Sequence, residues 1–187
     1  MIAGVDEAGR GALAGPVVAA AVVLDPALPP DLFLDSKQLT AAKREALFII
    51  LEASESHIGV GVHSAFYVDQ KNILKATLSA MSRSIMALSC TPDEVLIDGN
   101  KIPTLPRFSM RAIVHGDRLI PEISAASIVA KVLRDRMMDC LDKKFPAYGF
   151  QIHKGYGTAL HYEALFAHGI SDVHRKTFNL HRQQSLF

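Results

Sequence analysis

Asp6-Glu7-Ala8-Gly9-Arg10-Gly11 directly follows a short apolar run, Ile2 to Val5, that predicts a β-strand. Adjacent carboxylates repel each other and lose hydration when they are buried, so such a pair needs a counter-charge, which a divalent cation supplies. The two glycines allow backbone N–H groups to approach an anion closely, with Arg10 beside them. The hexapeptide therefore indicates metal and phosphate chemistry, and a solvated turn is the alternative that it leaves open.

The 187 residues, 49% of them hydrophobic, can bury the core of one domain with a C-terminal appendage. No apolar run has the length of a membrane span, no signal peptide is visible, and the two cysteines lack metal-ligand spacing. We therefore expect a cytoplasmic protein that does not associate with membranes. Residues 1–98 hold seven Lys and Arg against twelve Asp and Glu, whereas residues 99–187 hold thirteen against seven. This asymmetry suggests an acidic half that binds metal and a basic half that binds a polyanion.

Hydrophobic periodicity predicts strands early in the chain and helices that alternate with them later. The expected strands after the first cover residues 17–24, 56–63, 95–97 and 111–114. The expected helices run from Thr40 to about 51, over 70–89, from Pro121 to about 144, and between Thr158 and Gly169. This order predicts an α/β fold in which helices pack on a mixed sheet.

Acidic residues follow three of the expected strands, as Asp6 with Glu7, as Asp98 and as Asp117. The ends of strands that are distant in sequence can lie side by side in one sheet. Four converging carboxylates suit hard cations that prefer oxygen ligands, such as Mg²⁺ or Mn²⁺. Two such ions can activate a water molecule and stabilise the leaving oxygen of a phosphodiester. The sequence therefore predicts metal-dependent phosphodiester chemistry.

A series of motifs along nearly the whole chain resembles the bacterial ribonuclease HII family, the type 2 ribonucleases H. The matching segments are Asp6–Gly11, Ala14–Ala20, Asp35–Leu39, Asp98–Asn100, Gly116-Asp117, Ile123–Arg136, His153–Thr158 and His174-Arg175. The resemblance implies a ribonuclease H-like catalytic domain, residues 1–145, and a small C-terminal helical region, residues 146–187, that completes the substrate site. It also implies hydrolysis of the RNA strand of RNA/DNA hybrids and incision 5′ of ribonucleotides embedded in duplex DNA. The expected products carry a 3′-hydroxyl and a 5′-phosphate.

The resemblance also assigns the acidic residues. It implies that the catalytic, metal-binding carboxylates are Asp6, Glu7, Asp98 and Asp117. Asp135 in the later helix is an alternative to Asp117, although its arginine neighbours favour a structural ion pair. The segment after Asp117 departs from the family pattern, because Arg118 to Glu122 stand where a lysine and serines are expected.

The resemblance further implies that Gly9, Arg10 and Gly11 read the ribose 2′-hydroxyl at the RNA–DNA junction, and backbone groups can do so because this hydroxyl both donates and accepts. Tyr156 resembles the aromatic residue that packs against the following deoxyribose, and a packed loop aromatic is the alternative. Hydroxyls and cations hold nucleic-acid backbones without reading sequence. The candidate phosphate contacts, each of which could instead be a cap or a solvated charge, are Ser36, Lys37, Ser124, Ser127, Lys131 and Arg134.

The tail Gln183-Gln184-Ser185-Leu186-Phe187 is similar to the pentapeptide by which bacterial replication and repair proteins bind the sliding clamp. Gln184 departs from the usual leucine. The alternative is that the terminal Leu186 and Phe187 pack back onto the domain. We expect the enzyme itself to be a monomer.

Two other classes of protein remain open on the sequence alone. A nucleic-acid-binding module without activity would lack one acid of the set, whereas all four are present. A general DNA nuclease or resolvase of the same fold superfamily would use clustered acids but would not need the Gly-Arg-Gly motif or Tyr156. Cleavage of matched substrates with and without one ribonucleotide discriminates among these classes.

Overall fold

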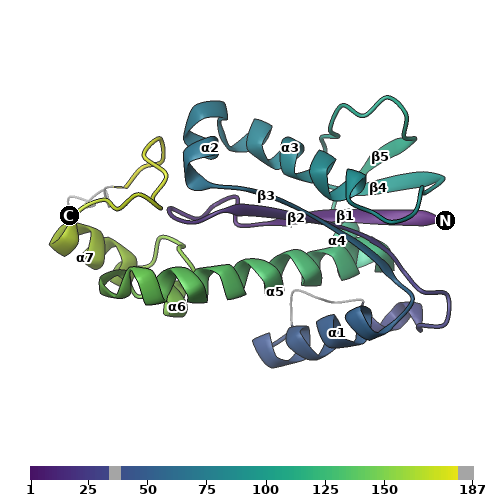
Figure 1. Ribbon diagram of the computed structural model, residues 1–187, viewed down its shortest axis with the longest axis horizontal. Coiled ribbons are helices and arrows are strands. Elements are labelled where there is room, and N and C mark those ends of the chain that lie inside the picture. The colour runs from purple at the N-terminus through teal and green to yellow at the C-terminus, as the bar shows by residue number, and fades with distance from the viewer. Residues whose placement is uncertain (34–38, 181–187) are drawn as a thin grey trace.

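A mixed five-stranded sheet forms the centre of the protein, and helices cover both of its faces (Figure 1). The computed structural model describes residues 1–33 and 39–180. The strand order is β3-β2-β1-β4-β5, in which β1 and β2 pair antiparallel, as do β2 and β3, while β1, β4 and β5 run parallel. The strands are β1 Ile2–Ala8, β2 Val17–Val23, β3 His57–His63, β4 Glu94–Asp98 and β5 Met110–Ile113.

The helices follow the expected order, with short additions. They are α1 Ala41–Ala53, α2 Ala65–Lys71, α3 Ile73–Met86, α4 Gly116–Leu119, α5 Pro121–Lys144, α6 Phe150–His153 and α7 Ala159–His168, with 3₁₀ turns at η1 Pro30–Leu32 and η3 Pro146–Tyr148. Thr40 and Thr158 cap α1 and α7 by accepting hydrogen bonds from backbone N–H groups, as their positions predicted. The single turn of α6 was not expected from the sequence.

The long helix α5 lies directly against β1 and β2. A Cβ atom added at Gly4 would lie 2.1 Å from the backbone of Glu122, so a side chain at this position would push the helix off the sheet. The small residues of α5, Ala125, Ala126 and Ala130, are buried in the same cluster as Ala20 and Val22 of β2. This close packing fixes the face of α5 that is presented to the even-numbered residues of β1.

Helix α3 covers the opposite face of the sheet (Figure 1). Ala3 and Val5 of β1 pack there with Ala80, Met81 and Ile85 of the helix, and all are at most 3% exposed. All seven residues of β2 are buried, as in a strand that is covered on both faces.

Two expectations about element boundaries were wrong. The helix expected over 70–89 is two helices, because Asn72 has a φ of 68° and its side chain caps α3 by accepting from the N–H of Lys75. The acidic pair does not follow β1 but lies within it, and Asp6 pairs with Ala20 of β2. The antiparallel partner extends the strand beyond its apolar residues.

The C-terminal region packs against the far end of α5 (Figure 1). Phe150 of α6 and Leu165 of α7 share a buried cluster with Leu13, Ala14 and Met138. The loop after β1 is therefore enclosed between α5 and the C-terminal region. No helix among residues 1–33 and 39–180 is both long and apolar enough to cross a membrane.

Candidate active site

Two of the predicted acids project from neighbouring parallel strands. Val5 of β1 pairs with Ile97 of β4, so Asp6 and Asp98 are the next residues along the two strands. Side chains alternate between the faces of a sheet, and Val5 and Ile97 both face α3, so both acids lie on the α5 side. The backbone N–H of Asp117 in α4 lies 3.4 Å from Oδ1 of Asp98, which brings the third segment to the same place. Asp6 and Asp117 are 6% and 1% exposed.

The acids of β1 are electrostatically unfavourable as they stand. Burial raises the pKa of the Asp6 carboxyl well above its usual value, and repulsion from Glu7 and Asp98 raises it further, while a hydrogen bond from the Ser127 side chain opposes the rise. Burial also raises the pKa of Glu7, although the ion pair with Arg10, at 3.2 Å, partly compensates. A divalent cation would remove this repulsion.

The chemistry of the donors fits such a cation. Asp6, Glu7, Asp98 and Asp117 offer only carboxylate oxygens, the ligands that Mg²⁺ and Mn²⁺ prefer. Within the part of the chain that the structure describes, no group of three or more His, Cys, Asp or Glu side chains already stands at ligating positions.

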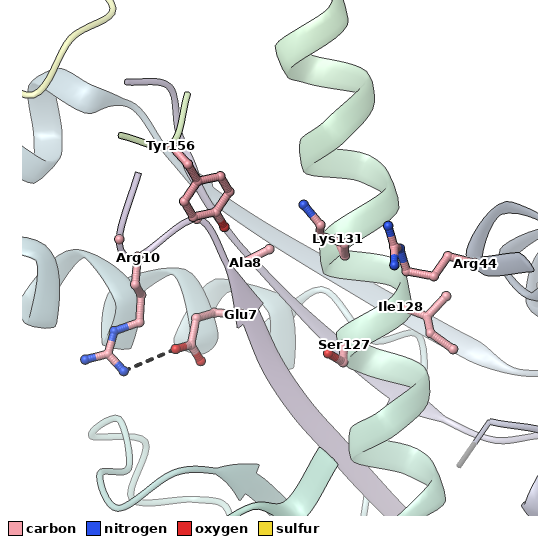
Figure 2. A pocket seen from close by; sticks show the side chains of 10 residues that line it. Glu7, Ala8, Arg10, Arg44, Ser127, Ile128, Lys131 and Tyr156 are labelled. Carbon is pink, nitrogen blue, oxygen red and sulfur yellow. Dashed lines mark hydrogen bonds and ion pairs between the residues drawn. The ribbon is translucent and has the colours of Figure 1, made fainter. Parts of the chain in front are cut away.

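A pocket of about 390 Å³ opens next to these acids (Figure 2). Its wall brings together β1 with the loop that follows it, the helices α1 and α5, and the loop before α7. The lining residues are Glu7, Ala8, Gly9, Arg10, Gly11, Arg44, Ser127, Ile128, Lys131 and Tyr156. Seven residues expected from the sequence to bind metal or substrate thus share one cavity.

Gly9 has a conformation and a position that suit glycine alone. Its φ is 91°, and a Cβ atom there would lie 2.0 Å from Nε of Arg134. By contrast, a Cβ atom at Gly11 would meet nothing within 4 Å, so the space beyond it is open. The loop thus rests on a buried guanidinium and presents Arg10 and Gly11 to the pocket.

Tyr156 faces two cations of α5. Its ring centroid lies 5.6 Å from Nζ of Lys131 and 5.1 Å from Cζ of Arg134. Its backbone is held as well, because the Tyr156 carbonyl accepts a hydrogen bond from Nδ1 of His161 at 3.0 Å, and Gly155 N–H donates to Nδ1 of His153 at 3.2 Å. Figure 2 shows the ring on one side of the pocket, across from Lys131 and Arg44.

The predicted phosphate contacts fall into three groups. Ser127 and Lys131 line the pocket. Ser124 and Arg134 do not: both are fully buried, Ser124 donates to the Phe33 carbonyl, and Arg134 donates to the carbonyls of Ala14, Pro16 and Lys154. Both were expected to contact a phosphate at the surface, but both are buried, and the helical periodicity of this segment does not show which loops cover a polar side chain. Ser36 and Lys37 lie outside the described residues.

One pocket residue was missed by the sequence reasoning. Arg44 of α1 lines the pocket, and its guanidinium donates to the Leu39 carbonyl at its own helix end. In the sequence Arg44 belongs to no motif, so the only available signal was its helical position just after the segment Asp35–Leu39.

Asp117 and its alternative, Asp135, have different surroundings. Asp135 pairs with Lys131 at 2.8 Å within α5, the i to i+4 arrangement of a helix ion pair. Asp117 is buried in α4 beside Asp98. The surroundings of Asp117 are therefore those of the acidic cluster, and those of Asp135 are those of a structural ion pair.

The sequence and the fold both match known proteins. The family model described as Ribonuclease HII matches residues 3–183. The chain is 52% identical over 178 residues to Ribonuclease HII of Shewanella loihica, an alignment that covers 94% of this chain and 86% of that protein.

Two solved structures share the fold. Ribonuclease H2 of Pyrococcus horikoshii superimposes with a TM-score of 0.80 at 27% identity, and the match covers 96% of this chain and 94% of that one. RNase HII of Archaeoglobus fulgidus, solved in complex with PCNA, gives a TM-score of 0.79 at 26% identity, with 99% and 98% of the two chains covered. The expected ribonuclease H-like α/β fold is thereby confirmed.

Proposed function

This chain belongs to the ribonuclease HII family, endonucleases that hydrolyse RNA in RNA/DNA hybrids, and we propose that it also incises duplex DNA 5′ of single embedded ribonucleotides. The observation that carries the proposal is the shared pocket of Glu7, the Gly9–Gly11 loop and Tyr156. These groups come from opposite ends of the chain, and a nuclease that ignored the sugar would not need them together. The proposed products carry a 3′-hydroxyl and a 5′-phosphate.

The catalytic centre in this proposal consists of Asp6, Glu7, Asp98 and Asp117. When bound there, two divalent cations such as Mg²⁺ or Mn²⁺ would activate a water molecule and stabilise the departing 3′-oxygen. Asp6 and Asp117 are buried, and burial raises the pKa values of Asp6 and Glu7, which a bound cation would lower again. Ser127 orients the Asp6 carboxylate through its hydrogen bond, and Arg10 restrains Glu7 through its ion pair.

The proposed reading of the sugar uses two elements of the pocket wall. The Gly9–Gly11 backbone approaches the ribose and exchanges hydrogen bonds with its 2′-hydroxyl, which donates and accepts. The ring of Tyr156 packs against the following deoxyribose, where a hydroxyl would clash. Lys131, Ser127 and Arg44 also line the pocket, with Lys131 and Arg44 across from Tyr156 (Figure 2), and would contact phosphates. The C-terminal region, residues 146–187, contributes through Tyr156.

Three matched duplexes test this function: all-DNA, DNA with one ribonucleotide, and a long RNA/DNA hybrid. We expect cleavage of the second and third in Mg²⁺ or Mn²⁺, with a single cut on the 5′ side of the ribonucleotide, and no cleavage of the first. Equal cleavage of all three would identify a general nuclease, and binding without cleavage would identify an inactive module. Mapping the ends with a 3′-phosphate-specific phosphatase separates the proposed products from their reversed counterparts.

We further propose that residues Gln183–Phe187, which lie outside the described residues, bind the sliding clamp. The support is the similarity of this segment to clamp-binding pentapeptides, together with the Archaeoglobus relative solved in complex with PCNA. Deleting the five residues should abolish binding to a bacterial clamp in a surface plasmon resonance assay. Cleavage of short duplexes should stay unchanged, because the deletion spares the pocket. Undiminished clamp binding by the truncated enzyme would end this proposal.

A further inference from the structure

Two arginine side chains, Arg134 of α5 and Arg175 after α7, are fully buried behind the pocket wall. Burying a charge is costly unless it is paired or well hydrogen-bonded. Every hydrogen bond that either guanidinium makes to the described residues ends on a backbone carbonyl oxygen, and none ends on a carboxylate. Both side chains therefore hold the main chain in place.

Arg134 joins two loops that are distant in sequence. Its Nε donates to the Pro16 carbonyl at 3.0 Å and its Nη2 to the Ala14 carbonyl at 3.2 Å, both in the segment after the Gly-Arg-Gly motif. Its Nη1 donates to the Lys154 carbonyl at 2.9 Å, two residues before Tyr156. One planar fork thus joins the two loops, which the N–H groups of Leu13 and Ala14 also join directly through hydrogen bonds to the Gly155 carbonyl.

The same guanidinium also contacts both recognition elements directly. Its Cζ lies 5.1 Å from the centroid of the Tyr156 ring, and its Nε occupies the space beside Gly9 where a Cβ atom would be. Arg175 reinforces one side, because it donates to the carbonyls of Arg10 and Gly15 at 2.9 to 3.2 Å. Arg134 therefore contacts both recognition elements.

We propose that Arg134 is a positioning residue that determines junction selectivity by fixing the Gly9–Gly11 loop and Tyr156 relative to each other. This inference rests on the proposed function of that pocket. A direct phosphate contact does not explain the residue, since its side chain is not exposed to solvent. Lysine would keep the positive charge but would lose the rigid guanidinium fork that reaches three carbonyls at once. The Arg134→Lys variant therefore separates the effect of the charge from the effect of the guanidinium geometry.

Selectivity, measured as the ratio of cleavage of a single embedded ribonucleotide to cleavage of a long hybrid, tests the proposal. We expect Arg134→Lys to lower this ratio by about tenfold, the effect of a small displacement of a positioned group. Tyr156→Ala should lower it comparably, and the double variant should fall no further, because both changes remove one function. Arg136→Lys, two positions away on the same helix and exposed, is the matched control and should keep the ratio.

A second measurement follows the ring itself without any catalysis. The chain has no tryptophan, so Tyr156→Trp introduces a single tryptophan at the pocket, which can be excited separately from the remaining tyrosines. Adding Arg134→Lys should increase its quenching by acrylamide and lower its anisotropy, whereas adding Arg136→Lys should change neither. An unchanged signal together with an unchanged cleavage ratio would overturn the assignment.

The two measurements separate the failure of this inference from the failure of the proposed function. If Tyr156→Ala leaves the cleavage ratio unchanged, the junction role of the pocket fails, while the fluorescence still decides whether Arg134 holds the ring. If Tyr156→Ala lowers the ratio and Arg134→Lys does not, only the inference fails. If Arg134→Lys does not fold, the same cleavage ratio and fluorescence are measured with Arg134→Gln instead. If neither variant folds, Arg134 serves overall stability, and the specific positioning role is overturned.

Discussion

Two clusters of titratable side chains differ in how burial affects them. The acidic cluster consists of Asp6, Glu7, Asp98 and Asp117, and the histidine cluster of the C-terminal region consists of His153, His161 and His174. In the acidic cluster the groups repel each other, and the pKa values of Asp6 and Glu7 are raised, first by burial. In the histidine cluster, uncharged imidazole rings hydrogen-bond to each other and to the backbone. The first region thus keeps carboxyl groups that repel each other, whereas the second pairs its polar groups within itself.

The histidine cluster is a chain of hydrogen bonds with one consistent direction. Ser171 N–H donates to Nδ1 of His174, whose Nε2 lies 3.0 Å from Nε2 of His161, and Nδ1 of His161 donates to the Tyr156 carbonyl. Only neutral rings satisfy this chain, because a second proton would place two N–H groups face to face. Burial, followed by repulsion from His161, lowers the pKa of His174 to about 4.

The largest expected effect tests the acidic half of the comparison. Asp6→Asn keeps the shape of the side chain but removes a ligand charge, so cleavage of the one-ribonucleotide duplex should fall by roughly a thousandfold or more, about 4 kcal/mol of transition-state stabilisation. Initial rates in saturating Mg²⁺ measure this loss. Asp135→Asn, which removes an acid paired with Lys131, is the control and should lose far less. Full activity of Asp6→Asn would refute the catalytic assignment.

The lowered pKa of His174 in the histidine cluster predicts that the free energy of unfolding falls in acid. His174 takes up its proton at a lower pH in the folded chain than in the unfolded chain, so the unfolded state binds more protons between pH 6.5 and about 4. The free energy of unfolding should therefore fall across this window as the pH falls, by on the order of 2 kcal/mol. Urea unfolding at a series of pH values measures it.

Two variants make that experiment specific. His174→Gln should flatten the pH dependence, whereas His168→Gln, at an exposed position, should leave it unchanged. An identical pH dependence of the wild type and of His174→Gln from pH 6.5 to 4 would contradict the account of a neutral cluster.

The acidic cluster should show the reverse pH dependence when no metal is present. Because the pKa values of Asp6 and Glu7 are raised, the folded state retains protons that the unfolded state has lost, and stability falls as the pH rises above their ordinary values. Asp6→Asn should therefore stabilise the metal-free protein at neutral pH, by about 1 kcal/mol. Thermal unfolding in a chelator measures this gain. Added Mg²⁺ should stabilise the wild type and have less effect on the variant, and an Asp6→Asn protein that is less stable in the chelator would contradict the picture.

The smallest effect concerns the wall of the pocket beside Glu7. Arg44→Ala should weaken binding of a non-cleavable duplex by about threefold and reduce the slope of log affinity against log salt by about one, the signature of one lost phosphate contact. Fluorescence anisotropy at several salt concentrations measures both. Lys43→Ala is the matched control, because Lys43 is adjacent in sequence, exposed and outside the pocket lining. Identical slopes for the two variants would remove Arg44 from the substrate site.

The two regions also differed in how well the sequence predicted them. Asp6, Glu7 and Asp98 lie in strands and Asp117 lies in α4, all within recognisable sequence motifs. Their residue types and order therefore indicated metal chemistry before any fold was known. The sequence did not identify the histidines as a cluster, because a lone histidine in a sequence does not show what it contacts. Their neutral network depends on His153, His161 and His174 meeting across loops.

Errors occurred where contacts between distant segments decided the outcome. Arg134 and Ser124 were expected to contact phosphate, yet both are buried, because the loop after β1 and the segment before α1 cover that side of α5. Arg44 was not expected at all and reaches the pocket because α1 lies beside α5. The break at Asn72 was missed because it depends on the positive φ of that residue, which apolar spacing does not reveal.

The sequence by itself determined the order of the elements, the mixed sheet and the carboxylates that can bind a divalent cation. These features follow from local periodicity and from the kinds of residue that a chemistry requires. Only the tertiary structure decided which cations face the pocket, which are enclosed as supports, and which histidines stay uncharged. Those properties depend on burial and on partners contributed by other segments, and a side chain acquires them only when the chain folds.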